Sequence, residues 1–351
     1  MGELADPDSM MKTIKCAVWD LDNTVWKGIL LEDSEVSLNP DAAVVIKALD
    51  SRGILNSVAS RNHLEAARAK LVELGLWDYF LYPQINWNSK DSSVAAIAER
   101  LRIATDTFAF IDDQPFDREE VSFTLPDVRT YDAALIPTLP ELPEFNPVVT
   151  DEGASRRLMY IAEMRRDEEE AEYTGPKEEF LAGLAMNFRI FPARDQDLAR
   201  AEELTVRTNQ LNTTGRTYSL EELRAFTNSS DHILLMAELE DRFGTYGKIG
   251  LALIEKSQNN WILKLLLMSC RVLSRGVGAV LLNHIMRSAE EAGAGLVAEL
   301  IPNDRNRMML VTLRLAGFKE SGRDGDLMLL ENTKREVPPA PSWLKIDAVP
   351  V

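Results

Sequence analysis

Cysteine is scarce in this chain of 351 residues, which contains only Cys16 and Cys270. Two cysteines are too few for a disulfide framework, and their scarcity indicates a reducing compartment. The N-terminus reads Met-Gly-Glu-Leu-Ala-Asp-Pro-Asp and lacks the basic and apolar regions of a signal peptide. We therefore expect a cytoplasmic protein.

Long hydrophobic runs and excess positive charge are also absent. No apolar run approaches the roughly 18 residues of a membrane span, so we expect no membrane association. The formal net charge of −17 would repel a phosphate backbone, which argues against a nucleic-acid partner. Hydrophobic residues at 45% and charged residues at 27% are instead typical of a globular protein, here long enough for two domains.

Asp20 and Asp22 are the strongest chemical signal in the chain. They lie two positions apart at the end of an apolar run that begins at Cys16. Where a strand ends and the backbone turns, two such carboxylates can converge on one reacting centre. Phosphoryl transfer through an aspartyl phosphate needs a nucleophile and a second acid, which protonates the leaving oxygen and later deprotonates water. We assign Asp20 as the nucleophile and Asp22 as the acid/base.

Further polar groups that phosphoryl transfer needs occur later in the chain, each at the end of a predicted strand or the start of a predicted helix. Ser60 ends a second predicted strand, and its hydroxyl suits a phosphoryl oxygen. Lys90 precedes an alanine-rich helical stretch, where its ammonium would neutralise phosphate charge. Asp112 and Asp113 end a third apolar run, and oxygen ligands at one end of a sheet suit Mg²⁺.

The spacing of these runs predicts the architecture. Strand-like runs at 15–19, 54–59 and 108–111 alternate with helical stretches at 40–52, 62–74 and 91–101. This alternation predicts an α/β domain with a doubly wound parallel sheet, which binds ligands at the carboxyl ends of its strands. The short intervals between Asp20, Ser60 and Lys90 leave no room for a sizeable inserted cap, so we expect an open active site.

This ordered set resembles the haloacid dehalogenase superfamily of aspartate-nucleophile phosphatases, over residues 14 to about 130. The resemblance implies Mg²⁺ as cofactor, held by Asp20, Asp22, Asp112 and Asp113, and leaves open which of the last two is the direct ligand. It further implies contacts to phosphate or substrate from five residues: Asn23, Thr24, Ser60, Arg61 and Lys90.

Four prolines between 137 and 147 indicate an extended linker. We therefore predict a phosphatase domain at 13–147, a second domain at 148–335 and a Pro-rich, loose tail at 336–351; the motifs of the second domain, described next, resemble those of acyltransferases. The highly charged helical segment 154–171 is interpreted as a solvated helix face without chemistry.

The second domain contains a strand, a glycine-rich loop and a helix in succession. Residues 261–268 form the predicted strand, and Ser269-Cys-Arg-Val-Leu-Ser-Arg-Gly-Val-Gly-Ala279 forms the loop and the start of the helix. Such a loop exposes backbone N–H groups at a helix N-terminus, which suits phosphate. With Ala316-Gly-Phe318 downstream, the pattern resembles the acyltransferase fold of the N-acetyltransferase superfamily.

Cys270 lies at the end of that predicted strand, beside the loop. Arg271, Arg275 and the following helix N-terminus favour a thiolate, so we predict that Cys270 accepts an acyl group. The alternative is a small apolar filler of the core, which we expect for Cys16. His284, on the following helix, is a candidate general base.

The whole chain resembles the FkbH-like family, phosphatase–acyltransferase fusions of polyketide pathways. The motifs that carry the resemblance are Trp19-Asp-Leu-Asp-Asn-Thr-Val-Trp-Lys-Gly28, Phe110-Ile-Asp-Asp-Gln-Pro115, Arg207-Thr-Asn-Gln-Leu-Asn212, Phe243-Gly-Thr-Tyr-Gly247 and Ser269-Cys-Arg-Val272. The resemblance implies that Cys270 captures the glyceryl group of 1,3-bisphosphoglycerate as a thioester. It further implies that the enzyme removes the remaining phosphate and loads the phosphopantetheine of an acyl carrier protein. Implied substrate contacts come from Thr208, Asn209, Gln210, Arg271, Arg275 and Asn306.

Two alternatives from other functional classes remain open. One is a phosphatase joined to a coenzyme A-dependent acyltransferase. The other is a non-catalytic module that docks a carrier protein, which the intact pair of Asp20 and Asp22 argues against. Because the net charge repels an acidic carrier, we expect docking at a local basic patch of Arg271, Arg275, Arg305 and Arg307.

Overall fold

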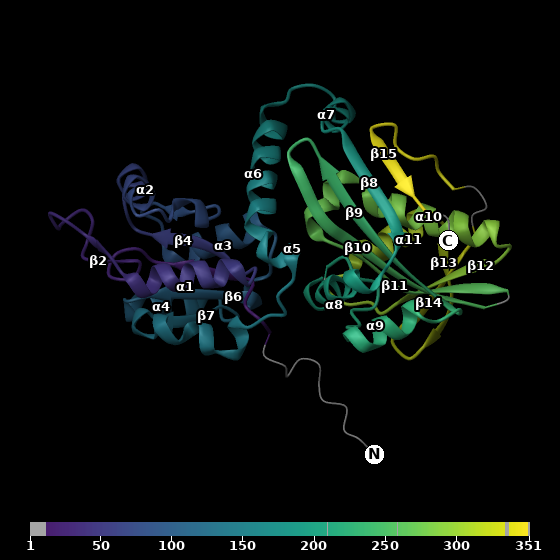
Figure 1. Cartoon of the computed structure of the whole chain (residues 1–351), viewed down its shortest axis with the longest axis horizontal. Coiled ribbons are helices and arrows are strands. Elements are labelled where there is room, and N and C mark those ends of the chain that lie inside the picture. Colours follow the sequence, from purple (N-terminus) through teal and green to yellow (C-terminus); the bar gives the residue numbers. More distant parts are fainter. Residues whose placement is uncertain (1–11, 209, 258, 334–336, 350–351) are drawn as a thin grey trace, which may run out of the picture. The chain divides into compact units, whose positions relative to one another are not determined.

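The computed structural model describes residues 12–208, 210–257, 259–333 and 337–349. The chain divides into two compact units between Ile161 and Ala162, which are described separately below (Figure 1). One unit contains a five-stranded parallel sheet, and the other contains a mixed eight-stranded sheet. The predicted α/β class with two sheets is confirmed.

The first unit is built on strands in the order β5-β4-β1-β6-β7. Their bounds are β1 (Cys16–Trp19), β4 (Leu55–Ser60), β5 (Gln84–Ile85), β6 (Phe108–Asp112) and β7 (Arg129–Asp132). Every residue of the three central strands is buried, as expected for a parallel sheet that helices cover on both faces. β1, β4 and β6 agree with the three predicted runs to within one residue, whereas β5 and β7 were not predicted.

Four helices connect these strands: α1 (Pro40–Ser51), α2 (Leu64–Glu73), α3 (Lys90–Leu101) and α4 (Pro115–Thr124). α1 begins where the Asn39 side chain accepts a hydrogen bond from the Asp41 backbone and Pro40 supplies a helical φ angle. Its buried residues, Ala42, Val45, Ile46 and Leu49, recur every three to four positions and face the core.

No cap domain interrupts the chain between β1 and α1. Only a short hairpin of β2 (Trp26–Lys27) and β3 (Ser37–Leu38) lies there. The carboxyl edge of the sheet therefore stays uncovered by any inserted domain of the first unit.

The proline-rich segment is not an extended linker. It forms two 3₁₀ helices, η4 (Ala133–Glu141) and η5 (Pro143–Phe145), which follow β7. Proline's fixed φ angle suits a 3₁₀ turn, and three apolar residues of these two helices, Ile136, Leu139 and Phe145, are buried in the first unit's core. The prediction failed because it considered the prolines and not the apolar residues of the same segment.

After α5 (Asp151–Ala154), α6 (Arg156–Glu172) spans the division between the units. We predicted a solvated helix face here, and this holds for Arg165 and Glu168, which are exposed, but not for the whole helix. Glu163 and Arg166 are buried, because both form ion pairs within the second unit. One part of the charged surface of α6 thus packs against the protein, while another part faces water.

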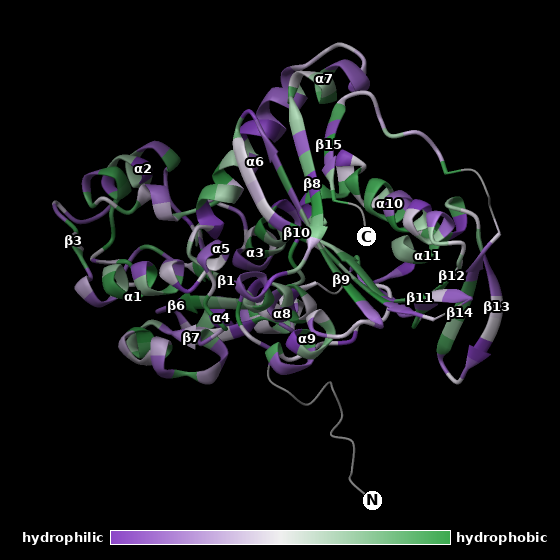
Figure 2. Ribbon diagram, turned by 45° about the vertical axis from the view of Figure 1, so that its right-hand side comes forward, coloured by the Kyte–Doolittle hydropathy of each residue, from purple (hydrophilic) through white to green (hydrophobic). Residues whose placement is uncertain are grey.

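The second unit contains strands in the order β13-β14-β12-β11-β10-β9-β8-β15. Their bounds are β8 (Met186–Pro192), β9 (His232–Asp241), β10 (Gly244–Lys256), β11 (Asn260–Met268), β12 (Gly295–Leu300), β13 (Phe318–Asp324), β14 (Leu327–Asn332) and β15 (Leu344–Ala348). The pairs β11/β12 and β8/β15 are parallel and the others antiparallel. Figure 2 colours much of β9 as hydrophobic, and nine of its ten residues are buried or half-buried, the exception being Glu240.

Helices cover both faces of this sheet. α7 (Lys177–Gly183), α10 (Val277–Glu291) and α11 (Arg307–Leu315) contribute to one core. α8 (Leu198–Arg207) and α9 (Leu220–Thr227) contribute to a separate core that contains Leu251 and Leu265 of the sheet.

The C-terminal segment is not a loose tail over its described residues. β15 pairs in parallel with β8, from Leu344 opposite Met186 to Ala348 opposite Ile190. Leu344 is buried in the core, which explains why the strand persists beyond three prolines. None of the described helices is long and apolar enough to cross a bilayer.

Candidate functional site

The carboxyl edge of the first sheet brings together Asp20, Lys90 and Asp112. Trp19 and Ile111 are partners in the parallel pairing of β1 and β6, so Asp20 and Asp112, one residue further along each chain, lie side by side. The Lys90 Nζ atom, at the start of α3, donates hydrogen bonds to the Asp20 carboxylate, to Asp112 Oδ2 at 3.0 Å and to the Ala59 carbonyl at 2.9 Å. Residues predicted from three separate sequence segments therefore meet at one point.

Burial gives these three charges unusual properties. Asp20, Lys90 and Asp112 are 6%, 3% and 0% exposed. Burial raises the pKa of Asp20 to about 7, although the Lys90 charge opposes that shift. Burial likewise raises the pKa of Asp112, against the pull of Lys90. Burial alone would lower the pKa of Lys90, but Asp20 and Asp112 outweigh it and raise that pKa. A further cation at this site would favour both carboxylates in their charged form.

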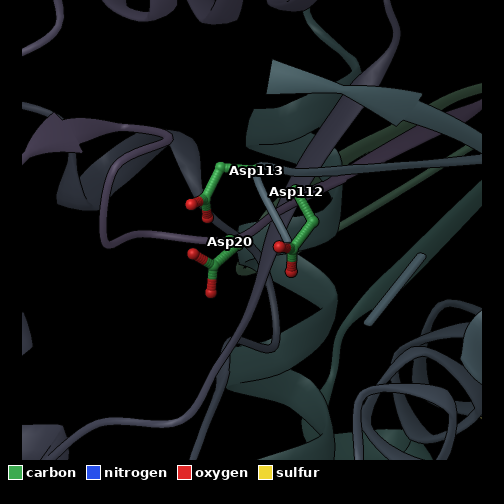
Figure 3. A group of neighbouring side chains, drawn as sticks. All are labelled: Asp20, Asp112 and Asp113. Carbon is green, nitrogen blue, oxygen red and sulfur yellow. The ribbon is translucent and has the colours of Figure 1, made fainter. Parts of the chain in front are cut away.

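The site can hold a divalent cation. Asp20, Asp112 and Asp113 each offer a carboxylate oxygen, and these oxygens lie within 4.8 Å of one another. Figure 3 shows the three carboxyl groups gathered around a common space. Carboxylate oxygens in such a group fit Mg²⁺. Asp22, which we also predicted as a ligand, is not part of this group.

Asp22 is instead fixed by hydrogen bonds from other segments. Its Oδ1 accepts from Trp26 Nε1 at 2.7 Å and from the Leu30 backbone at 3.0 Å, and its Oδ2 accepts from Asn62 Nδ2 at 3.2 Å. Asn62 is almost fully buried and was missed by the sequence analysis. Its position directly after a strand end, two residues from Ser60, was the available signal.

The other predicted phosphate contacts have varied surroundings. Ser60 ends β4 and is buried, and the Thr24 hydroxyl is buried without a hydrogen-bond partner among the described residues. Asn23 is exposed, adopts a left-handed φ of 56° and accepts a hydrogen bond from the Gly28 backbone, which closes the turn after β1.

The Arg61 guanidinium forms ion pairs with two carboxylates. It pairs with Asp117 at 2.9 Å and with Glu120 at 3.3 Å, both on α4. Asp117 also lies 4.0 Å from Lys90 Nζ, and Glu120 accepts a hydrogen bond from the Lys90 backbone. Sequence reasoning missed both acids, because a helical carboxylate several residues beyond a motif carries no distinctive pattern.

Cys270 begins a 3₁₀ helix, η7 (Cys270–Arg275), that follows β11 directly. Its side chain is partly exposed, whereas Cys16 is fully buried in β1, where burial raises the pKa of its thiol. Gly276 has a φ of 73° and joins η7 to the N-terminus of α10. The predicted succession of strand, loop and helix is present, and Cys16 belongs to the core as predicted.

Arg271 and Arg275 are not surface residues. They are 7% and 1% exposed. Arg271 donates to the Tyr246 carbonyl at 2.8 Å, and Arg275 pairs with Glu170 at 2.9 Å. The predicted basic docking patch is therefore wrong for these two residues, while Arg305 and Arg307 are exposed.

The remaining predicted contacts have different surroundings. Asn306 is buried, and its amide donates to the carbonyls of Asn212, Thr213 and Ile301, so it joins loops of the fold. Thr208 is buried at the end of α8 and Gln210 is exposed. Asn209 lies outside the described residues.

His284 does not line the apolar cavity that lies beside the start of α10. His284 lines a small cavity with Ile346 and Ala348 of β15, where burial lowers its pKa. A second cavity of about 180 Å³ lies at the helix N-terminus. Leu273, Gly276, Gly278, Met308 and Met309 are among its lining residues, and His284 is not.

Comparisons with known proteins give partial matches to two kinds of solved structure. The N-terminal part of the protein BF1531 from Bacteroides fragilis, which contains a phosphatase domain complexed with Mg, is 26% identical, with a TM-score of 0.33 over 38% of this chain. The match spans 40% of that protein. The ribosomal-protein-S18-alanine N-acetyltransferase of Escherichia coli is 15% identical, with a TM-score of 0.33 over 42% of this chain and 96% of the enzyme.

A third match is the GNAT domain of S. lividans PAT, at 20% identity and a TM-score of 0.33, over 40% of this chain and 88% of that domain. No protein-family model matches the chain, and no curated protein matches it either. Scores of this size carry no conclusion about activity, which therefore depends on the geometry of the sites.

Proposed function

We propose that the first unit is a Mg²⁺-dependent phosphatase in which Asp20 is phosphorylated during turnover. The observation that carries this proposal is the buried contact of Lys90 with both Asp20 and Asp112, next to Asp113. A nucleophile, a fixed cation and carboxylate ligands for a second cation are the groups that phosphoryl transfer needs.

The residues divide the reaction between them. An Asp20 oxygen attacks phosphorus, the bond from phosphorus to the ester oxygen breaks, and Asp22 protonates the departing alkoxide. Asp22 then takes a proton from water, which attacks the aspartyl phosphate and releases inorganic phosphate with Asp20 regenerated. Lys90 offsets charge on the transferring group, and bound Mg²⁺ would supply further electrostatic stabilisation. The hydrogen bonds from Trp26, Leu30 and Asn62 hold Asp22 in place for both proton transfers.

For the second unit we propose acyl transfer through Cys270. The thiolate attacks the carboxyl carbon of an acyl phosphate, the bond from carbon to the phosphate oxygen breaks, and phosphate leaves. The substrate we propose is 1,3-bisphosphoglycerate, whose remaining phosphate monoester the first unit removes. The thiol of a carrier protein's phosphopantetheine then takes the glyceryl group by thioester exchange. Support comes from the partly exposed Cys270 at a strand end and from the ordered sequence motifs.

One observation favours a second candidate for this unit. The apolar cavity at the N-terminus of α10 is suited to a pantetheine chain, which coenzyme A also carries. A coenzyme A-dependent acyltransferase predicts binding of free coenzyme A and no acyl adduct on Cys270. Isothermal titration with coenzyme A and mapping of acylated peptides distinguish the two candidates.

The phosphatase proposal is tested by Asp20→Asn, which is nearly isosteric but cannot form the aspartyl phosphate. We expect hydrolysis of a small phosphate ester to fall by several orders of magnitude. Asp106→Asn is the matched control, because Asp106 pairs with Lys12 just before β6, at the opposite end of that strand from Asp112. Near-normal Mg²⁺-dependent hydrolysis by Asp20→Asn would refute the assignment.

A further inference from the structure

The second unit contains a largely buried group of ionic and aromatic side chains that neither proposed half-reaction uses. We call it the arginine cluster, and its members are Glu163, Arg166, Glu170, Asp241, Tyr246, Arg271 and Arg275. The side chains of Arg166, Asp241 and Arg275 are each 0% exposed. Burying a charge this deeply is unfavourable in free energy unless the charge is paired. Each ion pair in the cluster therefore fixes the positions of its two side chains.

Arg166 of α6 fixes the hairpin between β9 and β10. Its guanidinium binds Asp241 through two hydrogen bonds, of 2.7 and 2.8 Å, and donates to the Gly244 carbonyl at 3.1 Å. The same group lies 3.8 Å above the centre of the Tyr246 ring. The Tyr246 hydroxyl donates to Asp241 at 3.1 Å, so the ring is held from both its face and its edge.

Two arginines connect this fixed hairpin and α6 to the helix that carries Cys270. Arg271, the residue after Cys270, donates to the Tyr246 carbonyl at 2.8 Å. Arg275, the last residue of η7, donates to Glu170 at 2.9 Å and lies 3.7 Å from Glu163. Six-residue 3₁₀ helices have weak internal hydrogen bonds, so these two contacts anchor η7 at both ends.

The charges of the cluster are balanced, with Arg166, Arg271 and Arg275 against Glu163, Glu170 and Asp241. Its contribution is therefore geometric rather than a supply of positive charge. We propose that Tyr246 and Arg275 are positioning residues that hold Cys270 in the orientation needed to attack the acyl substrate. This inference rests on the proposed function of Cys270. It also gives a role to the Phe243-Gly-Thr-Tyr-Gly247 motif, which the phosphatase and acyl-transfer steps leave unused.

The test compares two reactions of the same thiol in the full-length chain. Single-turnover acylation by 1,3-bisphosphoglycerate needs an oriented Cys270, whereas alkylation by iodoacetamide does not. For Arg275→Met we expect acylation to slow about tenfold or more, because small misplacements of a reacting group are costly, while alkylation stays within about twofold. Arg275→Lys should recover part of the loss. Glu170→Gln, which removes a partly exposed charge and keeps the side-chain shape, should show a smaller loss of the same kind.

Two control variants separate positioning from general destabilisation. Tyr246→Phe removes the hydrogen bond to Asp241 but keeps the ring over Arg166, so its loss of acylation should be smaller than that of Tyr246→Ala, which removes both contacts. Glu203→Gln breaks a buried 2.7 Å pair with Arg200 on α8, which packs in the other core, and should leave both reactions unchanged. Normal acylation by Arg275→Met, or a parallel fall in both reactions in Glu170→Gln, would overturn the positioning role. Absence of acylation in the unmodified protein would instead refute the proposed function, and the positioning role with it.

Discussion

Lys90 shows how one residue organises the phosphatase centre. Its ammonium, at the start of α3, joins the ends of three strands: β1 through Asp20, β4 through the Ala59 carbonyl and β6 through Asp112. Asp20 remains hard to ionise even with this partner, because burial raises its pKa to about 7. The positive charge of Lys90 therefore does not balance the negative charge of the ionised carboxylates until a second cation binds. This imbalance predicts how stability depends on pH and Mg²⁺.

A buried carboxyl whose pKa is raised in the folded state holds its proton more tightly than in the unfolded state. Without Mg²⁺, Asp20 should therefore make the first unit less stable as the pH rises from about 4 to about 7. Mg²⁺ needs ionised ligands and should recover this loss, so its stabilisation should be larger at pH 8 than at pH 6. Thermal unfolding with Mg²⁺ and with a chelator measures the difference.

Asp113→Asn should remove most of the Mg²⁺ effect, because it withdraws one carboxylate from the group of three. Asp106→Asn, at the other end of β6, should keep it. An equal Mg²⁺ shift at both pH values would contradict the ligand assignment.

At the scale of helices and strands, the sequence predicted the elements that have a strong period or burial pattern. The fully apolar run before Asp20 and the capped α1 were predicted to within a residue. Elements whose state depends on distant partners were not. The segment 154–171 looks solvated from its charges alone, but pairing with Asp241 and Arg275 buries Arg166 and Glu163. β15 follows three prolines and becomes a strand because β8 offers it an open edge.

The same distinction holds for the site residues. Asp20 and Asp112 end apolar runs and Lys90 precedes a helical stretch; the three were predicted to meet, and they do. Arg271 and Arg275 were predicted at a surface, because a one-dimensional pattern cannot show that acids from α6 and a carbonyl from β10 surround them.

The observed role of β15 leads to a prediction about stability. Leu344→Ala should lower the free energy of unfolding of the second unit by about 2–4 kcal/mol, because it removes a buried leucine from the core. Lys345→Ala, on the exposed side of the same strand, should change it by less than about 0.5 kcal/mol. Urea unfolding followed by circular dichroism measures both. Equal, small effects would show that β15 contributes little to the second unit.

For the whole molecule, the net charge of −17 makes carrier docking an electrostatic problem. An acidic carrier is repelled at long range, so it needs local cations, and Arg305 and Arg307 are exposed at the start of α11. We expect the double variant Arg305→Glu, Arg307→Glu to slow carrier loading, with a difference from the unmodified protein that shrinks as salt rises. Hydrolysis of a small phosphate ester should be unchanged. A loading rate that does not depend on these charges would exclude this surface.

The central claim is that one chain captures an acyl phosphate on Cys270 and removes phosphate at Asp20. Intact mass and peptide mapping after mixing with 1,3-bisphosphoglycerate, without carrier protein, test both halves together. The unmodified protein should carry a hydroxylamine-labile glyceryl group on Cys270, and Asp20→Asn should carry the same group heavier by one phosphoryl. Cys16→Ala should still be acylated in its folded fraction, since that cysteine belongs to the core. An adduct in Cys270→Ala, or a dephosphorylated adduct in Asp20→Asn, would contradict the account.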